Sequence, residues 1–234
     1  MVRAVLFDLG GTLVDYFDQK EFSFVLRQGI FLVRHFLDKT SHSLPSQVEM
    51  WSRVESENHT SPDYRVRPLE DRLVRIFGIN PDDGATIEAM CQAFMKPIFV
   101  RGMCFRDSVP LLEWLKMRGV LTAIVSNTPW GSPAHLWRED LRRFDLELLV
   151  DAVIFCRDVG WRKPAPTMFQ KALESLGVGP EESLFVGDHP QWDVEGARSA
   201  GITPVLIDRT GIGRIPGVQS IGSLVDLPVK FDLA

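Results

Sequence analysis

The chain has 234 residues and a net charge of −5, with 45% hydrophobic and 24% charged residues. Its length is enough for one large domain or for a core domain with a smaller second domain. This acidic balance without a basic patch argues against nucleic acid as a partner, and no apolar stretch has the length of a membrane span or the form of a signal peptide. The three cysteines lack metal-ligand spacing and are odd in number, so we expect a reducing, cytoplasmic environment rather than a disulfide framework.

Short apolar runs along the chain are predicted to be strands. They are rich in Val, Ile and Leu at both alternating positions, which indicates strands buried on both faces of a parallel sheet. The runs are AVLF before Asp8, LTAIV before Ser126, DAVIF before Cys156, SLFVG before Asp188 and TPVLI before Asp208.

Helical patterns lie between these runs. Residues 109–117 have Asp107 or Ser108 as a possible N-cap and Gly119 just beyond their end, and residues 167–176 stop at Gly177. Alternating strands and helices over residues 105–208 favour right-handed crossovers and an α/β fold with a doubly wound, Rossmann-like, mostly parallel sheet.

Residues 16–104 interrupt this alternation. Apolar residues recur there with helical spacing, and no convincing strand pattern is present. The helices expected in this part of the chain span residues 21–39, 46–57, 68–77 and 84–99. We therefore expect a core formed by residues 1–15 and 105–234 and an all-helical insertion formed by residues 16–104. Ligands of open α/β sheets bind at the carboxyl ends of the strands, so this insertion would lie over the binding crevice.

Polar side chains gather at the ends of the predicted strands. They include three carboxylates, a hydroxyl group and a lysine, contributed by Asp8, Ser126, Lys163, Asp188 and Asp193. Carboxylates held close together repel one another, so such a cluster indicates a hard cation. Mg²⁺ suits this donor set, because it binds one or two carboxylates together with waters and a substrate phosphate. An aspartate can also attack phosphorus and form an aspartyl-phosphate.

The motifs that carry these residues resemble those of the haloacid dehalogenase superfamily. They are FDLGGTL (7–13), VSNT (125–128), RKPAP (162–166) and GDHPQWD (187–193), and they stand in the superfamily's order. The resemblance covers essentially the whole chain and extends to a helical, C1-type cap between the first two motifs. It implies a phosphatase-like hydrolase that depends on Mg²⁺ and acts on a small phosphorylated metabolite.

The resemblance also implies roles for particular residues. Asp8 would be the nucleophile, and Ser126 and Lys163 would bind the phosphoryl group, together with Asn127 and Gly11. Mg²⁺ would be held by Asp8, Asp188 and the main-chain carbonyl of Gly10. Asp193 would act from behind these groups, through water or by orienting Lys163.

Gly10 departs from the superfamily's usual pattern, in which a second aspartate two residues after the nucleophile acts as the acid and base. Glycine keeps the carbonyl for the metal but removes a proton donor that is typically worth about 10²–10⁴-fold in rate. We expect a weakened phosphatase that favours substrates with good leaving groups. The nearest replacement acids in the sequence are Asp15, Asp18 and His189.

Two alternatives stay open at this point. A 2-haloacid dehalogenase also lacks the second aspartate, but such enzymes typically carry tyrosine there, need no metal and do not keep the pattern of Asp188 and Asp193. A binding or regulatory protein would keep the phosphate site with negligible turnover, and Gly10 is the feature that favours it. The substrate and the oligomeric state are not fixed by the sequence.

Overall fold

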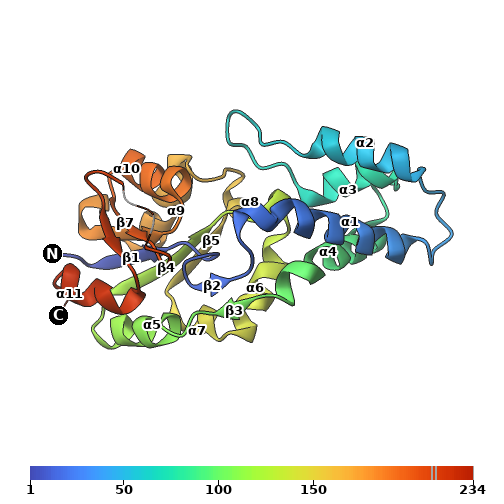
Figure 1. Ribbon diagram of the computed structural model, residues 1–234. Coiled ribbons are helices and arrows are strands. Elements are labelled where there is room, and N and C mark those ends of the chain that lie inside the picture. The colour runs from blue at the N-terminus through green and yellow to red at the C-terminus, as the bar shows by residue number, and fades with distance from the viewer. Residues whose placement is uncertain (212, 214, 234) are drawn as a thin grey trace.

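A parallel sheet forms the centre of the structure. The structure is a computed structural model, and it describes residues 1–211, 213 and 215–233. Within these residues the sheet has six strands in the order β5-β4-β1-β6-β7-β8, and every neighbouring pair is parallel (Figure 1). The strands are β1 (Ala4–Phe7), β4 (Leu121–Ser126), β5 (Ala152–Phe155), β6 (Ser183–Gly187), β7 (Thr203–Ile207) and β8 (Gln219–Ile221). The five strands predicted from apolar runs are therefore confirmed, and β8 is an addition.

Helices cover both faces of this sheet. Alternate residues of β1 point to opposite sides: Leu6 packs in one cluster with Phe169, whereas Phe7 packs in another with Leu112. The first face is covered by α9 (Pro166–Leu176) and α10 (Gly196–Ser199), and the second by α5 (Ser108–Met117), α7 (Leu146–Leu149) and α11 (Leu227–Lys230). Two further helices, α6 (Ala134–Arg143) and α8 (Cys156–Val159), flank β5. The doubly wound α/β fold expected from the sequence is confirmed.

A helical lobe extends from one end of the sheet (Figure 1). It consists of α1 (Phe22–Leu37), α2 (Gln47–Glu57), α3 (Leu69–Phe77) and α4 (Gly84–Phe99), which correspond to the helices predicted from apolar spacing. A side chain at Gly29 would meet the main-chain oxygen of Phe94 at 2.9 Å, so glycine allows α1 to approach α4 closely. No described helix is long and apolar enough to cross a membrane.

The two chain segments that join the lobe to the core run side by side. They pair as a short antiparallel ribbon, β2 (Val14–Asp15) with β3 (Met103–Cys104), which the sequence patterns did not predict. The main-chain oxygen of Leu13 accepts hydrogen bonds from the Ser108 hydroxyl at 2.8 Å and from the Phe105 N–H at 3.0 Å. Entry to and exit from the lobe are thus fastened directly behind the loop that follows Asp8.

The lobe contacts the core a second time through a short strand pairing. Arg65 and Trp161 form an antiparallel bridge, in which the Val66 N–H donates to the Gly160 oxygen at 3.0 Å and the Arg162 N–H donates to the Tyr64 oxygen at 2.8 Å. We call this pairing of residues 64–66 with residues 160–162 the seam. It places the lobe against the segment that leads into Lys163.

Asp107 occupies the predicted N-cap position of α5, but its side chain makes no capping hydrogen bond. Its carboxylate instead pairs with Arg209 at 2.9 Å and accepts from the Ser223 hydroxyl at 2.6 Å. Charged and hydroxyl partners from the C-terminal part of the chain compete successfully with the local cap.

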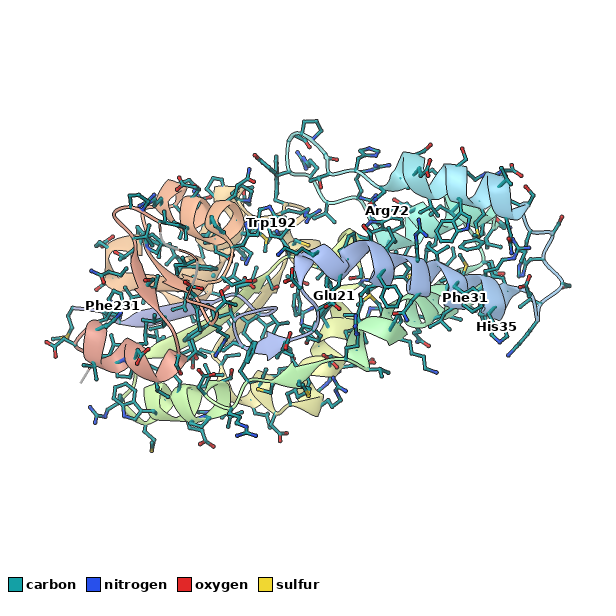
Figure 2. The ribbon with its side chains drawn as sticks, in the orientation of Figure 1. Glu21, Phe31, His35, Arg72, Trp192 and Phe231 are labelled. Atoms are coloured by element: carbon teal, nitrogen blue, oxygen red, sulfur yellow. The ribbon has the colours of Figure 1, made fainter. Side chains whose placement is uncertain are left out.

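Core packing makes a first prediction. Phe185 is 1% exposed and meets the Phe169 ring edge-on, with the ring centroids 4.9 Å apart. The change Phe185→Ala therefore leaves a cavity and should lower the free energy of unfolding by about 3–5 kcal/mol. Urea denaturation measures this loss. Phe31→Ala is the matched control, because Phe31 lies on the lobe surface (Figure 2) and is 65% exposed; it should cost less than about 1 kcal/mol. Equal losses in the two variants would contradict the assigned packing.

Candidate active site

The sheet register brings the motif residues to one edge. Phe7 stands opposite Ile124 of β4 and Val186 of β6, and the Asp8 N–H continues the ladder by donating to the Val186 oxygen at 2.9 Å. The chain leaves each strand within the next residues, so Asp8, Ser126 and Asp188 emerge at the same carboxyl edge. This is the position at which open α/β sheets bind their ligands.

Lys163 lies between two of the carboxylates. Its Nζ donates to Asp8 Oδ1 at 2.5 Å and to Asp193 Oδ1 at 2.7 Å, and it is 2% exposed. Burial alone would lower the pKa of Lys163, but the charges of Asp193 and Asp8 outweigh burial and raise this pKa above its ordinary value. The lysine therefore remains an ammonium ion and fixes one oxygen of Asp8.

Asn127 holds the main chain of Lys163 rather than presenting its own side chain to the crevice. Its Nδ2 donates to the Lys163 oxygen at 3.1 Å, and its Oδ1 accepts from the Lys163 N–H at 2.8 Å. Ser126 is 5% exposed, and its hydroxyl donates to the Asn127 oxygen at 3.3 Å. The Asn127 side chain is thus a clamp on Lys163, and its main-chain N–H is the group left for the expected contact with substrate.

The carboxylates of Asp8, Asp188 and Asp193 each place an oxygen within 4.8 Å of the others. Asp188 is exposed at the edge of the cluster, but partial desolvation by the surrounding protein and then the Asp8 charge raise the pKa of Asp188 to about 8. Burial raises the pKa of Asp8 to about 6 in spite of Lys163. Asp193 already accepts from Lys163 and, through Oδ2, from the His189 N–H at 2.9 Å. Asp8 and Asp188 are therefore the carboxylates that fit a cation such as Mg²⁺, which prefers oxygen ligands and offsets this repulsion.

The two adjacent glycines of the first motif differ in whether the structure requires glycine at their position. Gly11 has φ +80°, and a Cβ there would lie 2.4 Å from Asp188 Oδ2, so only glycine fits. Gly10 has no such constraint: its Cβ would have an ordinary contact of 3.7 Å with Tyr16, and its φ lies outside the left-handed region. The fold would accept a side chain at position 10.

The three sequence candidates for a replacement acid lie in different settings. Asp15 is an exposed residue of β2, and Asp18 accepts from the Lys20 N–H at 2.9 Å. His189 stacks on Trp192 with ring centroids 3.9 Å apart, and its Nδ1 accepts from the main-chain N–H groups of residues 191 and 192. The proton of a neutral His189 ring is therefore on Nε2.

Aromatic and arginine side chains line the junction between lobe and core. Arg65 lies over the Trp161 ring at 4.1 Å, while Trp130 is buried against Phe94 of the lobe with ring centroids 5.6 Å apart. Figure 2 shows Trp192 on the side of the core that faces the lobe. These contacts join residues far apart in sequence, so spacing could not have predicted them.

The fold and the site together define an α/β enzyme with a carboxylate–lysine centre at the strand ends. Comparison with protein families gives the assignment: residues 2–201 match the haloacid dehalogenase-like hydrolases, and the chain belongs to this family.

Individual relatives show how far the similarity extends. A phosphoserine phosphatase of Thermus thermophilus is 43% identical over 105 residues, which are 45% of this chain but only 41% of that protein. A glyceraldehyde 3-phosphate phosphatase of Methanopyrus kandleri is 28% identical and covers 89% of this chain and 85% of its own length. The crystal structure of a HAD phosphatase from Thermococcus onnurineus is 27% identical, with a TM-score of 0.68 over 98% of this chain and 97% of that one.

The carboxylate cluster predicts a pH-dependent cost in stability. The pKa of Asp188 is raised in the folded protein, to about 8 from 3.8, so folding takes up a proton between these values and stability falls as pH rises through this window. Because Asp188 is exposed, solvent screening keeps this effect small. In EDTA, Asp188→Asn should therefore melt at a higher temperature than the wild type, and the difference should grow from pH 5 to pH 8.

Melting curves at each pH measure this difference, and each kcal/mol corresponds to about 2–4 °C for a chain of this size. Mg²⁺ should then stabilise the wild type more than Asp188→Asn. A variant that is less stable than the wild type at pH 8 in EDTA would contradict the described electrostatics.

Proposed function

We propose that this hydrolase is a Mg²⁺-dependent phosphatase that cleaves a small phosphorylated metabolite through an aspartyl-phosphate on Asp8. The observation that carries the proposal is the placement of Asp8, with one oxygen fixed by Lys163 at 2.5 Å and Asp188 beside it. The phosphatase names of the relatives support the same substrate class.

In the first step, Asp8 Oδ2 attacks phosphorus while Lys163 holds Oδ1. A bond forms between Oδ2 and phosphorus, and the bond from phosphorus to the ester oxygen breaks, so the leaving group departs as an oxyanion with the electron pair and takes its proton from solvent. Ser126, Lys163 and the main chain at Gly11 and Asn127 bind the phosphoryl oxygens. Asp8, Asp188 and the Gly10 carbonyl would hold Mg²⁺, which would supply positive charge that offsets the charge of the phosphoryl group.

In the second step, water attacks phosphorus and the bond from phosphorus to Asp8 Oδ2 breaks. Inorganic phosphate leaves with the protons of the water, and the Asp8 carboxylate is restored. Asp193 keeps Lys163 in place throughout, through its 2.7 Å contact with Nζ. With glycine at position 10 no carboxyl group protonates the leaving oxygen, so alcohols that leave as stable anions react best. Aryl, acyl and anomeric sugar phosphates are substrates of this kind.

The helical lobe serves, in this proposal, as a cap over the strand ends. In this proposal the cap consists of residues 16–104 and the core of residues 1–15 and 105–234. The seam brings the cap against the segment that leads into Lys163. A cap that closes over the crevice favours small substrates over proteins and nucleic acids. The described cysteines are free thiols, which fits a reducing cytoplasm.

Hydrolysis of p-nitrophenyl phosphate tests the proposal. The wild type should turn over with Mg²⁺ and lose activity in EDTA, and Asp8→Asn should abolish turnover because the amide is a poor nucleophile. Turnover that survives in Asp8→Asn would exclude the aspartyl-phosphate. Release of chloride from chloroacetate without metal would favour a dehalogenase, and phosphate binding without turnover of any ester would favour a binding protein.

A variant at Gly10 tests the missing acid. Gly10→Asp restores the carboxyl group at a position where a side chain fits, and it should accelerate hydrolysis of alkyl phosphates by about 10²–10⁴-fold while changing p-nitrophenyl phosphate hydrolysis much less. Gly10→Asn is the matched control, because it has the same size but cannot donate a carboxyl proton. Equal rates for the two variants on alkyl phosphates would show that proton donation does not limit the reaction.

A further inference from the structure

Arg209 joins three segments of the chain behind the nucleophile. It follows β7, and its Nη2 donates to the Thr12 main-chain oxygen at 2.7 Å. Both terminal nitrogens also bind Asp107, at 2.9 Å and 3.0 Å. The guanidinium lies 3.7 Å above the Phe105 ring, in the chain returning from the lobe. One side chain thus ties the loop after Asp8 to the core and to the exit from the lobe.

The partner of Arg209 is itself firmly anchored. Asp107 accepts from the Ser223 hydroxyl at 2.6 Å and from the Leu224 N–H at 2.9 Å. Burial would raise the pKa of Asp107, but the bonds from Arg209 and Ser223 lower it below its ordinary value. The carboxylate is therefore a fixed, charged support, and a bidentate guanidinium on it has a defined orientation.

The loop held by Arg209 is closed on itself. The N–H groups of Leu13 and Val14 both donate to the Leu9 oxygen at 2.9 Å, and the Gly11 N–H donates to the Val14 oxygen at 2.9 Å. Thr12, at the apex, is fully buried. Because the loop is this tight, a displacement of Thr12 also moves its neighbour Gly11.

Gly11 is the point at which this loop touches the carboxylate cluster. Its backbone approaches Asp188 so closely that a Cβ would lie 2.4 Å from Oδ2. Movement of the loop would therefore change the spacing between the Asp8 segment and Asp188. Errors of about 1 Å in such a spacing can cost about 10²-fold in rate.

We propose that Arg209 is a positioning residue that holds the loop of residues 9–14, and through it Asp8 and the Gly10 carbonyl, in register with Asp188. Its catalytic consequence rests on the proposed phosphatase function. The contact to the Thr12 oxygen, rather than the ion pair with Asp107, is the part that matters for the site.

The chain offers a matched control for this proposal. Arg138 also binds an aspartate with two nitrogens, at 3.1 Å and 2.7 Å to Asp158, and lies over the Phe155 ring at 5.4 Å. Its hydrogen-bond partners are Asp158 and the Val153 oxygen, both outside residues 9–14, so Arg138→Ala removes the same kind of ion pair without touching the nucleophile loop. Arg209→Ala and Arg209→Lys are compared with it, and lysine keeps the charge but not the fork of donors.

Two measurements are made on each variant. Hydrogen exchange of the peptide covering residues 9–14 should be faster in Arg209→Ala than in Arg138→Ala, when each variant is measured the same number of degrees below its own melting temperature. The kcat for p-nitrophenyl phosphate should fall by about 10- to 100-fold in Arg209→Ala with a smaller change in KM, and Arg209→Lys should recover only part of it. Arg138→Ala should keep the wild-type kcat.

Unchanged exchange of residues 9–14 in Arg209→Ala would overturn the proposal, and so would faster exchange with a wild-type kcat. The exchange measurement needs no turnover. If the wild type failed to hydrolyse phosphate esters, the proposed function would be refuted. The exchange measurement would still show whether Arg209 holds the loop.

Discussion

The buried ion cluster around Lys163 is the constraint on which the site depends. An ammonium group that is 2% exposed is tolerated because Asp8 and Asp193 both accept from it, and removing one partner of such a buried pair typically costs about 3–5 kcal/mol. With Asp188 added, three carboxylates face one lysine. The surplus of negative charge that makes this edge of the sheet unfavourable without a cation is the same property that would bind one.

The sequence predicted the parts of the fold that repeat a local pattern. Both-face apolar runs identified β1, β4, β5, β6 and β7, and helical spacing identified α1–α4. It missed β8, whose sequence QSI lacks a run of apolar residues, and the ribbon of β2 and β3, which is too short to have a period. The motifs located Asp8, Lys163, Asp188 and Asp193, but not the clamp of Asn127 on Lys163, 36 residues away, or the contact of Arg209 with Thr12, 197 residues away. Such contacts follow from tertiary packing and leave no local signal.

The pair of glycines after Asp8 separates demands of the fold from demands of the chemistry. Gly11 is required by a left-handed backbone and by the approach of Asp188, whereas Gly10 has room beside Tyr16 for a side chain. Steric limits therefore do not account for the absence of an acid at position 10. In the proposed mechanism, its absence restricts which leaving groups the site can handle.

In the proposed cap function, the seam is the lobe–core pairing that would have to separate if the lobe turned about the ribbon of β2 and β3. Opening the lobe on that side would break the two main-chain hydrogen bonds of the seam and the contact of Arg65 with Trp161. It would also break the ion pair of Arg157 with Glu70 at 2.7 Å and the hydrogen bond from Trp130 to Asn58, and each hydrogen bond typically contributes about 0.5–1.5 kcal/mol. The pull would act on residues 160–162, directly before Lys163. Asn127 fastens the Lys163 main chain to the end of β4 by two further hydrogen bonds, so Lys163 has an attachment to the core that does not depend on the seam. In the proposed cap function, this attachment keeps the charge that fixes Asp8 in place when the lobe opens.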